Sequence, residues 1–317
     1  MTSYGEAGIS LAKAEEVVER LRAAVESTRT EPVEGRFGAF AGLYALDDER
    51  LLAATTDGVG TKLMLARRAG RLFDAGVDLA AHCANDLATT GAEPLFFLDY
   101  AAAGELDLAE VADLVAGAAS VCREAGCAIL GGETAELPGI YREGELDFAG
   151  TMVGLVRRTE LVDGSRCEPG DIVLGLPSSG LHANGFTLVR SVLGDDNVDA
   201  DLLLAPTRFY LEDVRCLRAT CDVRALAHVT GGGIPGNLPR VLPAGLGARV
   251  DPQSWERPAV YAWLEERGVP EEEQRQVFNL GIGFCAVVPA ADAERSGFPV
   301  IGRLEKGLAG VAWTDAP

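Results

Sequence analysis

The sequence predicts a protein of two domains in the α+β class. At 317 residues the chain exceeds one typical core, and two domains of about 150 residues each are the default for that length. Strand-like and helix-like stretches are mixed in both halves, but the glycine-rich turns between them do not follow the regular alternation of a doubly wound sheet. Charge, glycine and proline cluster at Arg157–Asp171, so we expect the two domains at residues 1–162 and 163–317.

Cap residues and apolar spacing predict the elements of the first half. Ser10 can cap a helix whose apolar positions between Val17 and Val25 share one face. A loop at Glu31–Leu46 leads into a strand at Arg50–Thr55, and a short helix follows at Thr61–Ala69. A long helix is expected at Leu108–Ala125, ended by Gly126, with these residues inward: Leu108, Val111, Leu114, Val115 and Ala118. Three further strands are expected at "PLFFLDYAA" (94–102), "CAILGGETAELPG" (127–139, short and buried) and "DFAGTMVGLV" (147–156).

The second half repeats this mixture of strands, polar turns and helices. Strands are expected at "DIVLGL" (171–176), "VRALAHV" (223–229) and "FNLGIGFCAVVP" (278–289). Helices are expected at "FTLVRSVL" (186–193), at "RFYLEDVRCLRA" (208–219) and after the turn "TGGGIPGN" (230–237).

Composition excludes several classes of partner. With 28 Lys plus Arg against 48 Asp plus Glu, the formal net charge is −20, and nucleic acid or an anionic membrane would need a basic face. No apolar run approaches the ~20 residues of a membrane helix, and the first ten residues do not resemble a signal peptide. The seven scattered cysteines lack zinc or disulfide spacing and indicate small buried side chains in a reducing cytoplasm.

Three turns share one pattern, an apolar strand followed by glycines with small hydroxyls and then a helix. They are "TTDGVGTK" (55–62), "PSSGLHANGF" (177–186) and "HVTGGGIPGN" (228–237). Glycines let backbone amides approach a bound group and a helix start adds positive potential, so such turns suit phosphates. Each turn taken alone could equally be a tight turn and nothing more. Their spacing matches neither a dinucleotide fold nor a P-loop.

Acids stand beside these glycines. Asp57 lies inside the first turn, Asp86 in "CANDLATTGAEP", and Glu133 and Glu136 in "GGETAELPGIY". Mg²⁺ on a nucleotide would explain them, because Mg²⁺ prefers one or two carboxylates together with phosphate oxygens. The alternative is that they cap helices or turns. Lys62 could place a point charge on a phosphate, or be a plain surface lysine.

The chain has three histidines. His182 lies among glycines and hydroxyls, which suggests an exposed polar setting and contact with a ligand. His228 ends a strand before "TGGG" and could equally be a satisfied core residue, whereas helix packing is the expected role of His82. No pattern marks a nucleophile with its base, so covalent catalysis is unsupported.

Taken in order, the motifs resemble those of the phosphoribosylformylglycinamidine cyclo-ligase family over nearly the whole chain. The motifs are "TTDGVGTK", "CANDLATTGAEPLFFLDY", "GGETAELPGIY", "SSGLHANGFTLVR", "LAPTRFY", "HVTGGGIPGNLPRVLP" and "FNLGIGF". Relatives such as selenophosphate synthetase and thiamine-monophosphate kinase share the "DGVGTK" theme more loosely. The chain departs from the family at Ser10, where aspartate is frequent, at Arg36, where glycine is usual, and in a short connection at Ser191–Leu202.

The resemblance implies a homodimer in which the N-terminal domains pair to form a β-barrel, with ATP sites near that interface. It implies ATP-dependent, Mg²⁺-assisted closure of formylglycinamidine ribonucleotide to aminoimidazole ribonucleotide. Catalytic roles are expected for Asp57, Lys62, Asp86, Glu133 and His182, with Asp57 and Asp86 on the metal. ATP contacts are expected from Phe37, Gly38, Gly58, Gly60 and Thr61. Ribonucleotide contacts are expected from Ser178, Ser179, Asn184, Thr230, Gly231 and Gly232.

Two other hypotheses stay open at this point. One is a small-molecule kinase like thiamine-monophosphate kinase, against which "GGETAELPGIY" weighs; selenophosphate synthesis is weaker still, because no reactive cysteine or lysine loop precedes the first glycine turn. The other is an ATP-binding scaffold without turnover, against which the intact Asp57, Lys62, Asp86 and Glu133 argue.

Overall fold

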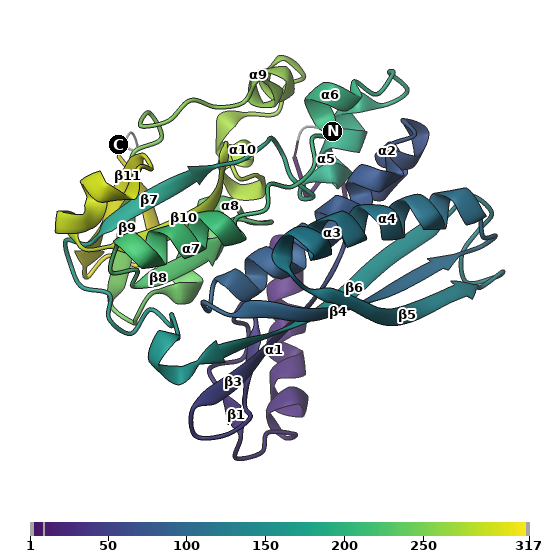
Figure 1. Ribbon diagram of the computed structural model, residues 1–317. Helices are drawn as coiled ribbons and strands as arrows, with labels where there is room; N and C mark the ends of the chain where they lie inside the picture. The colour runs from purple at the N-terminus through teal and green to yellow at the C-terminus, as the bar shows by residue number, and fades with distance from the viewer. Residues whose placement is uncertain (1–2, 9, 315–317) are drawn as a thin grey trace.

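The structure, a computed structural model, describes residues 3–8 and 10–314 and contains one six-stranded sheet in each half (Figure 1). The strands of the first half are β1 Val33–Glu34, β2 Gly42–Ala45, β3 Arg50–Gly58, β4 Glu93–Ala103, β5 Ala128–Glu136 and β6 Leu146–Arg157. Those of the second half are β7 Ile172–Pro177, β8 Ala225–His228, β9 Leu246–Val250, β10 Ile282–Val288, β11 Val300–Lys306 and β12 Val311–Trp313.

The two sheets are mixed and separate. The strand orders are β1-β2-β3-β6-β4-β5 and β12-β9-β11-β7-β10-β8. Neighbouring strands are antiparallel except for the pairs β4/β5 and β12/β9. Within the described residues no strand pairs across the two sheets. The mixed arrangement confirms the α+β prediction against a doubly wound sheet.

Helices cover the sheets. In the first half they are α1 Leu11–Glu26, α2 Lys62–Arg68, α3 Leu72–Ala88 and α4 Leu108–Ala125. In the second half they are α5 Phe186–Leu193, α6 Ala200–Leu203, α7 Leu211–Thr220, α8 Gly233–Asn237, α9 Ala259–Glu266 and α10 Glu271–Val277. Three 3₁₀ turns complete the set: η1 Arg158–Glu160, η2 Leu238–Val241 and η3 Ala290–Ser296. Among the described helices none is long and apolar enough to span a bilayer.

The helix α3 lies between the two halves of the molecule and supplies two residues of the candidate active site described below. It packs with α4 on one face of the first sheet, and its glycine allows the contact: a Cβ on Gly76 would lie 2.0 Å from the Leu114 carbonyl oxygen (Figure 1). On its other side, Asn85 Nδ2 donates to the Arg208 carbonyl at 2.9 Å, and Tyr210 N donates to Asn85 Oδ1 at 2.9 Å. These paired hydrogen bonds fix the second half against α3.

The opposite face of the first sheet is poorly covered. Side chains alternate along β3, so Leu51 and Ala53 are buried under the helices while Leu52 and Ala54 face the other way. Leu52 and Ala54 line a hollow of about 620 Å³ beside the C-terminal end of α1. The apolar positions of α1, such as Leu21, are also about half exposed.

Several predicted elements are confirmed. Ser10 caps α1 by accepting from Lys13 N, the bounds of α4 are those predicted, and Gly126 ends α4 in the left-handed region at φ 74°. The helix α3 and the strands β9, β11 and β12 were not assigned from the sequence.

Three details of the first half were predicted wrongly. Leu108 is 86% exposed and does not face inward. The strand β5 exists, but as an edge strand most of whose residues are exposed. Asp57 lies within β3, paired with Gly150 of β6, so it is a strand residue and the turn begins after Gly58.

Candidate active site

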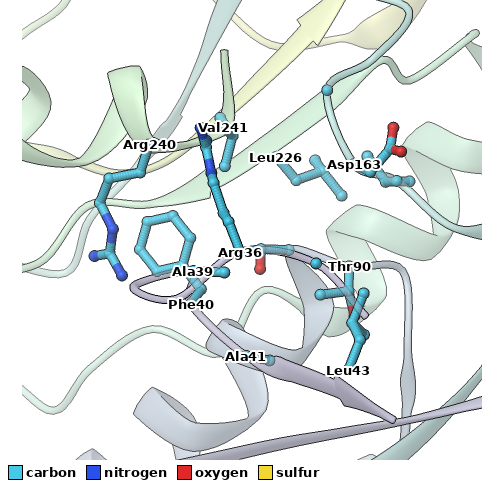
Figure 2. A pocket seen from close by; sticks show the side chains of 14 residues that line it. Arg36, Ala39, Phe40, Ala41, Leu43, Thr90, Asp163, Leu226, Arg240 and Val241 are labelled. Carbon is cyan, nitrogen blue, oxygen red and sulfur yellow. The ribbon is translucent and has the colours of Figure 1, made fainter. Parts of the chain in front are cut away.

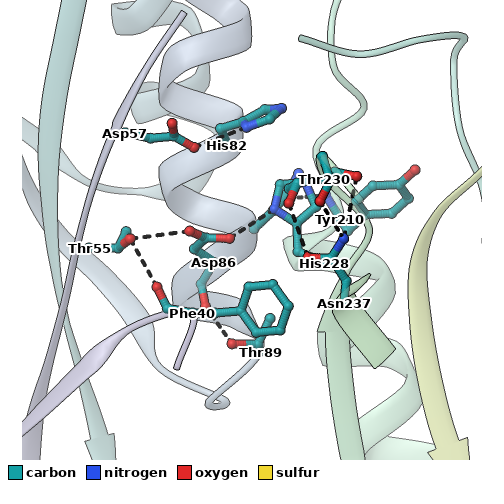
Figure 3. Close-up of polar contacts among 12 residues, drawn as sticks. Phe40, Thr55, Asp57, His82, Asp86, Thr89, Tyr210, His228, Thr230 and Asn237 are labelled. Carbon is teal, nitrogen blue, oxygen red and sulfur yellow. Dashed lines mark hydrogen bonds and ion pairs between the residues drawn. The ribbon is translucent and has the colours of Figure 1, made fainter. Parts of the chain in front are cut away.

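Two acids of the first half and two histidines meet at the junction of the domains, and we call Asp57, His82, Asp86 and His228 the acid–imidazole cluster (Figure 3). The helix α3 supplies His82 and Asp86, which are one turn apart and therefore on one face. Asp57 comes from β3, and His228 ends β8 of the second sheet.

Each acid of the cluster contacts one histidine. His82 Nδ1 lies 3.1 Å from Asp57 Oδ2, and His228 Nδ1 lies 2.9 Å from Asp86 Oδ1. Thr55 Oγ1 lies 3.2 Å from the second oxygen of Asp86, and Gly58 N donates to Asp57 Oδ1 at 2.7 Å. The two imidazole rings meet edge to face, with centroids 4.8 Å apart, so the two pairs form one polar network.

Burial and mutual charge separate the pKa values of the cluster. Burial and the charge of Asp57 raise the pKa of Asp86 to about 7. Burial also opposes ionisation of Asp57, but the hydrogen bond and charge of His82 outweigh it and lower the Asp57 pKa. Burial would lower the pKa of His82, yet its bond to Asp57 leaves that pKa raised, whereas burial and the charge of His82 hold the pKa of His228 well below its usual value. These directions favour an ionised Asp57 beside a protonated His82, and a neutral His228.

Asp57 and Asp86 are the two carboxylates of the cluster that could hold a Mg²⁺ ion. The charge of Asp57 disfavours ionisation of Asp86, and a divalent cation would relieve that repulsion. Within residues 3–8 and 10–314, no group of three or more His, Cys, Asp or Glu side chains is arranged to hold a metal ion. The other ligands would be phosphate oxygens and water, which is the usual set for Mg²⁺ on a nucleotide.

The structure corrects the prediction for His82 and decides between the two roles left open for His228. His82 is not a packing residue, because its ring contacts Asp57, and His228 is not merely a satisfied core residue, because its ring contacts an acid of the other domain. The four-residue spacing of His82 and Asp86 on one helix was the signal in the sequence that could have found His82. No local pattern indicates which acid faces His228.

Lys62 does not present a free charge to the site. Its Nζ lies 2.9 and 2.7 Å from the two carboxylate oxygens of Asp78 and donates to the Ala205 carbonyl at 3.1 Å. Asp78 Oδ1 also accepts from both N and Oγ1 of Thr207. Burial lowers the pKa of Lys62 despite the neighbouring Asp78. The ion pair lies within the first half, and its contacts with Ala205 and Thr207 tie it to the second half.

Two glycine turns of the second half lie against each other. A Cβ on Gly231 would lie 3.4 Å from Asn184 Oδ1, so the "SSGLHANG" and "TGGG" turns are neighbours. Thr230 Oγ1 donates to Asn237 Oδ1 at 3.1 Å, and the Asn237 amide donates to the Gly231 carbonyl at 3.1 Å, which shapes the second turn. The helix α5, which follows the "SSGLHANG" turn, contacts "TTDGVGTK", because Thr187 Oγ1 lies 3.1 Å from Thr61 Oγ1.

His182 is buried, at 1% exposure, so the exposed setting predicted for it is wrong. Its backbone φ is 60°, a left-handed conformation that non-glycine residues adopt seldom. In the same turn, Ser178 Oγ lies within hydrogen-bond distance of Asn279 Oδ1, at 3.0 Å, and Ser179 Oγ donates to the Pro206 carbonyl.

The loop expected to cover the nucleotide is held by the second domain. Arg240 donates from Nε and Nη2 to the Gly38 carbonyl at 3.3 and 3.1 Å, and its guanidinium lies 3.8 Å from the centroid of the Phe40 ring. Figure 2 shows Arg36, Phe40 and Arg240 around a small pocket of about 110 Å³. Phe37 is half-buried, and its ring lies under Arg22 of α1.

Glu133 is not brought to the acid–imidazole cluster. It is exposed on β5, and β6 and β4 lie between it and Gly58, which corresponds to about 14 Å at the usual strand spacing. Glu136, at the end of β5, accepts from Leu106 N at 3.0 Å, which is the turn role left open in the sequence analysis.

Comparison with known proteins places both halves in one family. The family described as AIR synthase related protein, N-terminal domain, matches residues 38–156, and the corresponding C-terminal domain matches residues 168–309. Phosphoribosylformylglycinamidine cyclo-ligase of Synechococcus sp. (strain CC9605) is 48% identical over 304 residues, 90% of this chain and 88% of that protein. The cyclo-ligase of Sorangium cellulosum (strain So ce56) is 49% identical over 314 residues, 93% of this chain and 90% of that protein.

Solved structures share the fold at much lower identity. The structure described as AaThiL complexed with AMPPCP and TMP has a TM-score of 0.71 at 16% identity, over 97% of this chain and 96% of that one. Thiamine-monophosphate kinase from Stenotrophomonas maltophilia K279a has a TM-score of 0.63 at 21% identity, over 94% and 95%. These two show the architecture alone, whereas the cyclo-ligases match in sequence over nearly their whole length. The chain therefore belongs to the phosphoribosylformylglycinamidine cyclo-ligase family.

Proposed function

We propose that this chain converts formylglycinamidine ribonucleotide and ATP to aminoimidazole ribonucleotide, ADP and phosphate, as one step of purine biosynthesis. The observation that carries the proposal is the acid–imidazole cluster, which joins the two domains beside three glycine turns suited to phosphates. The relatives that are nearly half identical are named for this reaction.

The reaction needs positioning and neutralisation of charge more than it needs a nucleophile. The formyl oxygen attacks the γ-phosphorus of ATP, and the bond from that phosphorus to the β,γ-bridging oxygen breaks to release ADP. The amidine nitrogen then attacks the activated formyl carbon. Loss of a proton and departure of phosphate complete the imidazole ring. No described residue needs to form a covalent intermediate.

The N-terminal half would bind ATP. The loop with Phe37 and Gly38 would cover it, and the turn with Gly58, Gly60 and Thr61 would receive its phosphates. AMPPCP, an ATP analogue, is bound in a structural neighbour, which supports a nucleotide site in this fold. Asp57 and Asp86 would hold Mg²⁺, which when bound draws negative charge from the phosphate oxygens. His82 would keep Asp57 ionised and oriented through its hydrogen bond.

The second half would hold the ribonucleotide between its two neighbouring turns. The candidate contacts are Ser178, Ser179, Asn184, Thr230, Gly231 and Gly232, with His182 beside them. Lys62 would act by holding the Asp78–Thr207 junction rather than by touching a phosphate. Glu133 would need a role away from the cluster, such as at a subunit interface, since it is exposed on the edge strand.

The proposal also covers the domain bounds, the pairing of subunits and the location of the enzyme. The domains would be residues 1–162 and 163–317, and the subunit would be one half of a homodimer formed through the first sheet. A cytoplasmic location is supported by the cysteines, which are all free thiols.

One assay tests the proposed function. ADP and inorganic phosphate are measured with ATP and Mg²⁺, with and without formylglycinamidine ribonucleotide. Equal amounts of ADP and phosphate, formed only when the ribonucleotide is present, support ring closure. Formation of ADP without an equal amount of phosphate would indicate a kinase. Release of ADP that does not depend on the ribonucleotide, or no release of ADP, would reject the proposal.

A further inference from the structure

Two backbone N–H groups determine which ring nitrogen of His182 carries the hydrogen. The backbone N–H groups of Ser179 and Arg208 both point at His182 Nε2, at 3.3 and 3.5 Å. These contacts are long, but both partners can only donate. Nε2 must therefore be the acceptor, and in a neutral imidazole the hydrogen is then on Nδ1.

The Nδ1–H group of His182 has no acceptor among the described residues. The atom is buried, and so is the whole side chain at 1% exposure. A buried donor without an acceptor destabilises the folded protein unless a ligand supplies one. In the same turn, Nδ2 of Asn184 is also buried without an acceptor in the described part of the chain, while its Oδ1 faces Gly231.

The ring is held rigidly despite an unfavourable backbone. The φ of 60° at His182 is a left-handed conformation that is uncommon outside glycine, although histidine, asparagine and aspartate adopt it more often than other residues. The ring edge lies on the backbone of Gly283, where a Cβ would be 2.3 Å from His182 Cε1 and 2.2 Å from the Tyr210 hydroxyl. Strain of this kind concentrates at functional sites, where it fixes a side chain in advance.

The imidazole ring of His182 is neutral at pH values near 7. Burial, followed by the charge of His82, holds its pKa well below the usual value. The ring therefore cannot serve as a titrating acid or base near neutrality. It can only offer its Nδ1–H as a fixed hydrogen-bond donor.

We propose that His182 Nδ1–H and the Asn184 amide form a site of neutral donors for an acceptor oxygen of the substrates, most simply a phosphoryl oxygen during transfer. The inference rests on the proposed function and specifies its mechanism: His182 stabilises developing negative charge without transferring a proton. Ser179 and Arg208 are positioning residues, because their backbone N–H groups select the tautomer.

Two substitutions separate the two ring nitrogens. His182→Asn places an amide N–H near the position of Nδ1, and asparagine tolerates the left-handed backbone. His182→Gln reaches the position of Nε2 and can accept from Ser179 and Arg208, but it has no donor at Nδ1. We expect His182→Asn to keep turnover within about tenfold of wild type, and His182→Gln to lose about a hundredfold or more.

The melting temperature of each variant accompanies the kinetics. A similar melting temperature for His182→Gln and wild type, with turnover lost, supports the donor role. The opposite order of activities, with glutamine active and asparagine inactive, would overturn the proposal. So would two folded variants that both turn over normally.

A direct measurement of the tautomer distinguishes failure of this inference from failure of the proposed function. The chain has three histidines, so the ring ¹⁵N resonances of His182 can be assigned by their absence in His182→Asn. In the ligand-free protein we expect a protonated Nδ1, a bare Nε2 and no titration between about pH 5 and 8. A protonated Nε2, or titration in that range, refutes the inference whatever reaction the enzyme catalyses.

The last part of the test adds ligands to the protein. Inorganic phosphate, ATP and formylglycinamidine ribonucleotide are added singly and in combination, and the Nδ1 resonance is followed. A shift with phosphate identifies a phosphoryl oxygen as the acceptor, and a shift with the ribonucleotide alone identifies an oxygen of that substrate. If no ligand or combination shifts the resonance, the donor site does not exist.

Discussion

At the scale of single residues, the charge of Asp57 is the first feature to test. Asp57→Asn keeps the shape of the side chain and can still accept from Gly58 N, but it removes the charge that pairs with His82 and would hold Mg²⁺. We expect turnover to fall at least about a hundredfold, with little change in melting temperature. Turnover is measured over a Mg²⁺ titration. Near-normal turnover that does not change with the metal concentration would show that Asp57 is only a structural residue.

The raised pKa of Asp86 predicts how metal-free stability depends on pH. The folded pKa is about 7 against a reference of 3.8, so the stability that comes with the protonated acid is lost as pH rises towards 7. Asp86→Asn cannot ionise. Its advantage over wild type in the free energy of unfolding should grow from about pH 4 to about pH 7, by at most about 4 kcal/mol, and then level off. Urea unfolding in the presence of a chelator measures this difference, and a constant difference across that range would contradict the prediction.

The buried ion pair of Lys62 makes a third prediction. Lys62→Met leaves the Asp78 carboxylate buried without its cation, which should cost about 3–5 kcal/mol of stability. The double variant Lys62→Met with Asp78→Asn should cost less than the two single changes added together, since the uncompensated charge is gone. Urea unfolding of all four proteins measures the coupling. If Lys62→Met is as stable as wild type but binds ATP more weakly, the phosphate role predicted from the sequence is right after all.

At the scale of elements, α3 has to lie close to α4 for its two site residues to be in place. A Cβ on Gly76 would lie 2.0 Å from the Leu114 carbonyl oxygen, a backbone atom that cannot move aside cheaply. Gly76→Ala should therefore push the helices apart, lower the free energy of unfolding by about 1–3 kcal/mol and reduce turnover, because His82 and Asp86 move with α3. Glu124→Ala, on the exposed side of α4, is the matched control. Equal stability of the two variants would mean that the contact is not tight.

At the scale of the whole molecule, the uncovered face and edge of the first sheet support the predicted homodimer. Leu98 of β4 is 40% exposed and Leu130 of the edge strand β5 is 65% exposed, although both are large apolar residues. We expect Leu130→Arg to shift the protein from dimer to monomer in sedimentation at micromolar concentration, with loss of turnover. Leu108→Arg, which changes a residue that is 86% exposed on α4, should leave the dimer intact. A fully active wild-type monomer would rule the dimer out.

What the sequence could predict was local. The Ser10 cap, the helix Leu108–Ala125 and its end at Gly126 follow from interactions within a few residues, so the pattern alone placed them. The order of motifs predicted the family, which the relatives then confirmed. Exposure was predicted less well, because Leu108 and β5 have the composition of buried segments and are exposed in the single chain.

The tertiary structure decided how these residues are combined. Asp86 and His228 are 142 positions apart and meet only because α3 of one domain packs against β8 of the other. The same packing places Thr207 against Asp78, the partner of Lys62, and buries His182 with one ring nitrogen facing two backbone N–H groups. A local pattern cannot encode such contacts, since the pKa, the tautomer and the free charge of a side chain depend on neighbours that long-range packing supplies. The sequence determined which chemical groups the site contains, and the fold determined their charge and direction.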